Sequence, residues 1–178
     1  LKRLVAYSSI GHVGYALAGV ATGTNEGMQS SVIYIIIYIL MNLGLFSCLL
    51  MMKRENQYYE KIEDLSGLSK NHPMLALSLM IILFSLAGIP PLAGFFAKFY
   101  VFKSVIEQSM YFLAIVGLLS TVVAAFYYLR LIKIMYFDKE KEKYDTDHGL
   151  WLKFSLTLST LLILVYFIFP SQLIEVVS

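Results

Sequence analysis

Lys98 is the residue in this sequence with the clearest capacity for chemistry, and it lies in the apolar stretch LAGIPPLAGFFAKFY. A charged side chain is costly there, because the flanking residues are as apolar as a bilayer core. Four residues that weaken helices come just before it: Gly88, Pro90, Pro91 and Gly94. An ionisable group beside a helix break is typical of sites that transport proteins build at membrane depth. The pattern therefore predicts a proton-transfer site at Lys98.

The expected depth of Lys98 supports that role. If Gln108 marks the outer surface, Lys98 is ten residues inside it, or about 15 Å along a helix. Removal from water favours the neutral amine, and a nearby negative charge favours the ammonium. Two alternatives stay open: a buried lysine paired with a fixed counter-ion, and a lysine nearer the outer surface. Lys103 is only five residues inside and is expected to snorkel out.

His12 is a second candidate, as a possible proton relay. Ser8 precedes it by four residues and Tyr15 follows by three, so the three side chains share one helix face. A polar stripe in an apolar helix should face the bundle or a water-filled cavity, where imidazole and hydroxyl groups can relay protons. Tight helix packing is the alternative, supported by the small residues Gly11, Gly14 and Ala18, and both interpretations remain open.

These residues must be positioned by membrane helices, because the composition leaves little room for a soluble domain. The chain has 178 residues, of which 58% are hydrophobic and 15% charged, and its mean hydropathy is +0.71. Such values predict an integral membrane protein. The single cysteine, Cys48, excludes an internal disulfide and is expected to be a small buried residue. The chain starts at Leu1 without Met or a signal peptide, so we expect the C-terminal part of a longer protein.

Five segments reach spanning length, and the predicted fold is an all-α, polytopic transmembrane bundle in one membrane domain, residues 1–178. The segments cover residues 4–21, 32–52, 73–107, 110–137 and 151–169. The third has 35 residues and would measure about 52 Å as one helix, against a hydrocarbon core of about 30 Å. We therefore predict two half-helices separated by a non-helical break within residues 88–94.

Basic residues alternate between the loops and predict the orientation. The loops 53–72 and 138–149 are rich in lysine, whereas the loop 23–30 and the turn 107–109 have no basic residue. By the positive-inside rule, the two basic loops lie together on the inner side and the C-terminus lies outside.

The remaining polar residues of the spans are expected to serve packing. Asn42 and Ser47 are the polar residues inside the second segment; Asn42 is assigned to a contact between helices, and Gly44 to a helix-breaking position. In the fourth segment we assign Ser120, Thr121, Tyr127 and Tyr128 to packing and to the membrane interface. The sequence contains no motif for NADH, flavin, iron–sulfur clusters or a metal, and no nucleic-acid partner is expected.

Three stretches resemble the antiporter-like membrane subunits of respiratory complex I. They are LKRLVAYSSIGHVGY at 1–15, FSLAGIPPLAGFFAKFY at 84–100 and FYYLRLIKIMYF at 126–137. These are similar to the start of the tenth helix, the broken twelfth helix and the end of the thirteenth helix of that family. The resemblance covers the whole chain as helices 10 to 14 of 14, and is closest to the subunit N group, called subunit 2 in mitochondria.

The resemblance implies that Lys98 is the lysine of the broken helix, near the outward proton half-channel, and that the subunit moves protons while quinone is reduced elsewhere. NADH, FMN, iron–sulfur clusters and quinone are then expected on other parts of the complex. The expected partners are other complex I membrane subunits, the lipid bilayer and protons. The expected location is the bacterial cell inner membrane or the mitochondrial inner membrane.

This sequence also departs from the pattern of the family. The family's lysine and glutamate of the seventh helix and its lysine of the eighth would precede this chain. Some sister subunits carry lysine and histidines in the eleventh helix, where this sequence has only Asn42. A cation/proton antiporter of the same ancestry stays an alternative function, and a membrane scaffold without conduction is a third.

Overall fold

The computed structural model describes residues 1–54, 57–59, 61–140, 144–145 and 149–166. Its helices are α1 (Lys2–Ala21), α2 (Asn25–Met51), α3 (Leu68–Asn71), α4 (Pro73–Ala87), α5 (Ala93–Glu107), α6 (Tyr111–Phe137), α7 (Leu150–Val165) and the 3-10 helix η1 (Ile62–Leu65). Two short strands, β1 (Lys53–Arg54) and β2 (Gln57–Tyr58), pair antiparallel. The predicted all-α bundle is confirmed, with this small ribbon as an unpredicted addition.

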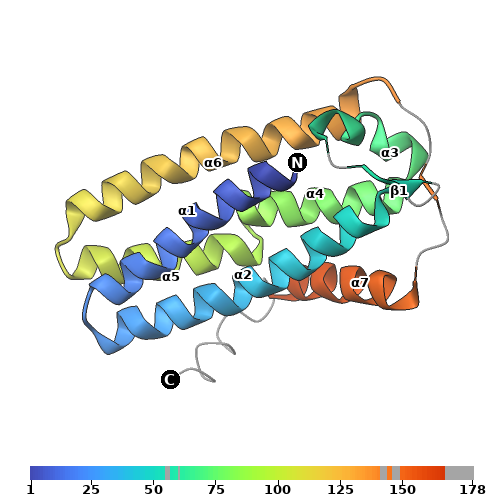
Figure 1. The fold of residues 1–178 in the computed structure, drawn as a ribbon. Coiled ribbons are helices and arrows are strands. Elements are labelled where there is room, and N and C mark those ends of the chain that lie inside the picture. The colour runs from blue at the N-terminus through green and yellow to red at the C-terminus, as the bar shows by residue number, and fades with distance from the viewer. Residues whose placement is uncertain (55–56, 60, 141–143, 146–148, 167–178) are drawn as a thin grey trace.

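The long helices lie side by side in a bundle, with α3 and the β1–β2 ribbon at one end (Figure 1). Among the described residues, α1, α2 and α6 are long and apolar enough to cross a membrane, and α4 and α7 are shorter apolar helices. The pair α4 and α5 corresponds to the predicted broken third segment. The fifth predicted segment is described only as far as residue 166, so its last residues lie outside the described part.

Helix α2 forms the centre of the core. Its residues Tyr34, Ile37, Met41 and Leu45 recur every three or four positions and are at most 3% exposed, which places them on one inward face. Cys48 continues this face and is fully buried, as predicted. The opposite face of α2, which the other helices leave exposed, is also apolar, as expected for a surface against lipid or further protein.

The predicted break between the half-helices is confirmed, since α4 ends at Ala87 and α5 begins at Ala93. Gly88 ends α4 with φ +83°, a left-handed conformation that side chains disfavour. The amides of Gly88 and Ile89 both donate to the Phe84 carbonyl, at 3.1 and 3.0 Å. Two prolines follow, which cannot donate backbone hydrogen bonds. Gly94 is a correction: it belongs to the first turn of α5 and not to the unwound stretch.

The two basic loops meet at one end of the bundle, as predicted. The Tyr144 amide donates to His72 Nε2 at 2.9 Å, and the Asp145 amide donates to the Lys53 carbonyl at 2.9 Å. The Tyr144 hydroxyl donates to the Asp64 carbonyl, and burial raises the pKa of this phenol above its ordinary value. Which membrane side this end faces stays a prediction, and the C-terminal tail, 167–178, lies outside the described residues.

Three expectations for α2 were wrong. Helix α2 begins at Asn25, seven residues before the predicted start at 32, because the Thr24 side chain accepts from the Gly27 amide at 3.1 Å and caps it. It continues through Gly44, where the missing side chain makes room for Ile82 and Ser159. Asn42 bonds to the Tyr38 carbonyl of its own helix at 3.1 Å, and it makes no hydrogen bond to another helix among the described residues.

Ser47, for which the sequence indicated no particular partner, donates to Ser155 of α7 at 3.0 Å. The small residues of α1 do not act as expected within this chain. A side chain at Gly11 or Gly14 would meet nothing within 4 Å among the described residues, whereas Ala18 is buried. The close-packing argument for His12 therefore loses two of its three supporting residues.

Candidate functional site

Lys98 lies inside the bundle with 5% of its surface exposed. Its ammonium nitrogen donates to the backbone carbonyls of Leu86 and Ala87, each at 3.1 Å. These carbonyls belong to the last turn of α4, where a helix has no partners of its own for its C=O groups and carries partial negative charge. The break thus creates the acceptors that hold the lysine.

Gly88 makes room for this arrangement. A Cβ atom at Gly88 would lie 3.0 Å from Lys98 Cδ and 3.1 Å from Nζ, so a larger residue would press on the lysine. The left-handed turn at Gly88 and the space for Lys98 therefore both require glycine at the same position.

A second glycine fixes how the half-helices cross. A Cβ atom at Gly94 would overlap the Ser85 carbonyl oxygen and lie 3.0 Å from its Oγ. The Gly94 amide donates to Ser85 Oγ at 3.0 Å, and this hydroxyl is 3.1 Å from Met41 Sδ. Gly94 thus lets the start of α5 lie against the end of α4, next to the carbonyls that bind Lys98.

No carboxylate of the described residues lies within ion-pairing distance of Lys98, so the expected alternative of a fixed counter-ion has no candidate there. Lys98 also has an aromatic neighbour: Nζ lies 5.1 Å from the centroid of the Tyr15 ring, where the face of the ring attracts a cation. Lys103, by contrast, is 60% exposed and lies 3.6 Å from Glu107, as expected for a snorkelling residue.

His12 is 2% exposed and has a partner on each ring nitrogen. Nδ1 lies 2.6 Å from Tyr34 Oη of α2, and Nε2 lies 3.1 Å from Tyr128 Oη of α6. The Ser8 hydroxyl bonds to the same Tyr128 oxygen. The Tyr38 ring stacks on the imidazole with centroids 4.8 Å apart. The predicted polar face of α1 is confirmed, because Ser8, His12 and Tyr15 are all buried.

The four side chains Ser8, Tyr128, His12 and Tyr34 form a hydrogen-bonded row in which the direction of donation can reverse. A neutral imidazole has one donor and one acceptor nitrogen, so one tyrosine donates to His12 while the other accepts. If every hydroxyl turns, the imidazole changes tautomer and the hydrogen bonds run in the other direction. This is the chemistry that a proton relay needs, and it requires no net charge on the imidazole at rest.

Tyr15 lies between this hydrogen-bonded row and Lys98. Its ring centroid is 6.0 Å from that of Tyr34, and its hydroxyl lies 2.9 Å from Ser120 Oγ and accepts from Thr121 at 3.2 Å. No direct hydrogen bond connects Lys98 with His12 among the described residues. A cavity of about 430 Å³ between α5 and α6 is lined by both Lys98 and Thr121.

The sequence interpretation missed part of this site. Tyr34 and Tyr38 had no assigned role, and Tyr128 was assigned to packing and the interface. A signal was available, because a phenol in an apolar helix must find a hydrogen-bond partner when it is buried. Ser120 and Thr121 also bond to Tyr15 in addition to packing. In the described residues, no group of three or more His, Cys, Asp or Glu could hold a metal ion.

Comparison with known proteins identifies the family. Residues 1–124 match the family model described as NADH:quinone oxidoreductase/Mrp antiporter, transmembrane. The chain belongs to this antiporter family. The resemblance inferred from the three sequence stretches is thereby confirmed.

Curated members of the antiporter family are closely similar over the whole chain. NADH-quinone oxidoreductase subunit N of Pelagibacter ubique is 78% identical over 178 residues, which are 100% of this chain and 38% of that protein. The subunit N of Rhodospirillum rubrum is 49% identical over 98% of this chain and 36% of its own length. The chain therefore spans under two-fifths of the length of these relatives.

Solved structures of the antiporter family share the fold. A chain of respiratory complex I from Thermus thermophilus with bound aureothin is 28% identical, with a TM-score of 0.84, over 100% of this chain and 40% of that one. A chain of the Mrp complex from Dietzia is 20% identical, with a TM-score of 0.79, over 93% and 39% of the two chains. At that identity the second likeness shows the fold alone.

Proposed function

We propose that this chain is part of a proton-translocating membrane subunit of NADH:quinone oxidoreductase in a bacterial inner membrane, and that Lys98 is its proton carrier. One observation carries the proposal: Lys98 is buried at the helix break and held by two backbone carbonyls, with no carboxylate of the described residues paired to it. A lysine–carboxylate pair is a stable structural unit, whereas neutral dipoles leave the charged and neutral forms closer in free energy.

The helix break provides a way to shift the equilibrium between the charged and neutral forms of Lys98. The carbonyls of Leu86 and Ala87 favour the ammonium, and burial favours the amine. A small movement of α4 against α5 would lengthen these hydrogen bonds and release the proton. The proton would leave through the cavity beside Lys98, and His12 would relay protons from the inner side through Tyr34 and Tyr128. Water must bridge the gap between His12 and Lys98.

The redox chemistry would take place on other subunits. NADH, FMN, iron–sulfur clusters and quinone would act elsewhere in the complex, and this chain would contact other membrane subunits and lipid. The supporting observation is the likeness to proteins named NADH-quinone oxidoreductase subunit N and to a chain of a respiratory complex I structure.

A cation/proton antiporter is the second candidate, favoured by the fold shared with the Mrp complex. The two functions differ in their energy source. Inverted vesicles that contain the complete complex should acidify their lumen on addition of NADH, and vesicles without the subunit should not. Acidification should be measured with a fluorescent pH dye. Cation-driven proton exchange by the subunit in vesicles without NADH and without redox subunits would instead favour the antiporter.

The relay can be tested at Tyr128. Tyr128→Phe keeps the buried ring and removes the hydroxyl that bonds to Ser8 and His12. We expect NADH-driven pumping to slow roughly two- to tenfold, because a relay step loses a hydrogen bond of about 0.5–1.5 kcal/mol. Tyr111→Phe, an exposed position on the same helix, is the control and should pump normally. Equal pumping by both variants would assign His12 and Tyr128 to packing.

A further inference from the structure

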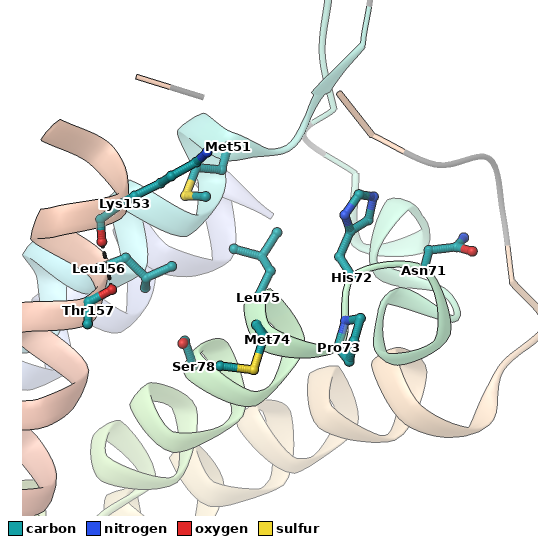
Figure 2. A pocket seen from close by; sticks show the side chains of 10 residues that line it. All are labelled: Met51, Asn71, His72, Pro73, Met74, Leu75, Ser78, Lys153, Leu156 and Thr157. Atoms are coloured by element: carbon teal, nitrogen blue, oxygen red, sulfur yellow. Dashed lines mark hydrogen bonds between the residues drawn. The ribbon is translucent and has the colours of Figure 1, made fainter. Parts of the chain in front are cut away.

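A pocket at the basic end of the bundle lies outside the proton site. It has a volume of about 450 Å³ and lies where α2 ends and where α4 and α7 begin (Figure 2). This is the end at which the two lysine-rich loops meet. The pocket therefore lies at the height of a membrane interface, on the side that the basic loops predict to be inner.

The lining is apolar at its base and basic at its rim. Met51, Leu75 and Leu156 line the pocket and are each at most 8% exposed. Lys153 is exposed, and its side chain extends toward Met51 (Figure 2). Lys153 forms no ion pair with a described residue, and none of the described lining residues is acidic. Ser78 adds a hydroxyl group to the lining.

The surrounding backbone adds positive potential. Both α4 and α7 start at the pocket, and neither has an acidic residue in its first turn or a side-chain cap. The positive ends of their dipoles supplement the charge of Lys153. The combination of one cation, two helix starts and an apolar base is complementary to a molecule with an anionic head and a hydrocarbon tail.

We propose that this pocket binds an anionic phospholipid. The phosphate would lie at the rim against Lys153, and the upper part of an acyl chain would cover Leu75 and Leu156. The volume is in the range of small-molecule sites, about 300–1,000 Å³, which suits the head end of a lipid whose chains continue into the bilayer. The proposal does not depend on proton transfer by Lys98.

The test uses the complete complex in nanodiscs with a photoactivatable phosphatidylglycerol, labelled near the top of one chain. Cross-linked peptides are read by mass spectrometry. We expect labelling around Met74 and Leu156, and Lys153→Gln should reduce it about fivefold, the size expected for one cation near an anionic lipid. Lys139→Gln removes an exposed lysine at the same end and should leave the labelling unchanged. Thr157→Trp should block the labelling by filling the pocket.

The competing occupants give different results. Inorganic phosphate should not reduce the labelling, since it lacks the apolar part. Equal labelling by a phosphatidylcholine probe, unaffected by Lys153→Gln, would mean ordinary boundary lipid and would overturn the proposal. Absence of lipid labelling together with protein cross-links from a reactive group placed at Met74 would also overturn it, because protein from another subunit or from the rest of this one would then cover the pocket.

Discussion

Lys98→Met should nearly abolish NADH-driven proton translocation by the assembled complex. Methionine keeps the approximate length of the side chain and cannot carry a proton. We expect a decrease of roughly tenfold or more, because a positioned proton-transfer group typically contributes about 10²–10⁴-fold to a rate. Assembly should survive, since methionine has a similar volume and the neutral carbonyls that bind Lys98 leave no unpaired buried charge behind. Proton uptake and NADH oxidation should be measured on the same vesicles.

Further substitutions at Lys98 distinguish a need for a group that can gain and lose a proton from a need for positive charge alone. Lys98→Arg should fail as well, because a guanidinium group stays protonated, whereas Lys98→Glu should restore part of the activity because a carboxyl group can also titrate. Lys103→Met is the matched control, since this lysine is exposed five residues away, and it should pump normally. A normally assembled Lys98→Met complex with the wild-type proton-to-electron ratio would make the lysine structural and refute the proposal.

Gly94→Ala should sharply reduce the amount of assembled complex. The added methyl group would overlap the backbone carbonyl of Ser85, and backbone at a helix crossing cannot move aside as a flexible side chain can. Overpacking of this kind costs about 1–3 kcal/mol, and here it also displaces the end of α4 that holds Lys98. The amount of complex should be measured by native gel electrophoresis, with pumping normalised to it.

Gly14→Ala is the control for this effect. A side chain at Gly14 meets nothing within 4 Å among the described residues, and alanine is a better helix former by about 1 kcal/mol. The complex should therefore assemble and pump normally. If Gly94→Ala assembles as well as Gly14→Ala, the close crossing of α4 and α5 is not needed for the fold.

The sequence by itself determined the parts of this protein that depend on local physics. Apolar runs of spanning length must become helices in a bilayer, because their backbone groups have no other partners. Two prolines and a glycine must interrupt such a helix, because the prolines lack backbone donors and the glycine adopts a left-handed turn. The break and the burial of Lys98 could therefore be predicted, as could the polar face of α1 with His12.

Only the tertiary structure decided what these groups contact. The partners of His12 come from α2 and α6, 22 and 116 residues away, and no periodicity within one helix specifies such pairs. The same holds for Lys98. Its acceptors are backbone carbonyls, which every residue type has, so the sequence does not indicate which residues bind it. Asn42 shows the converse, since a polar residue suited to a contact between helices bonds to its own helix. Contacts distant in sequence depend on how helices cross, and at Gly94 that crossing is set by a side chain that is absent.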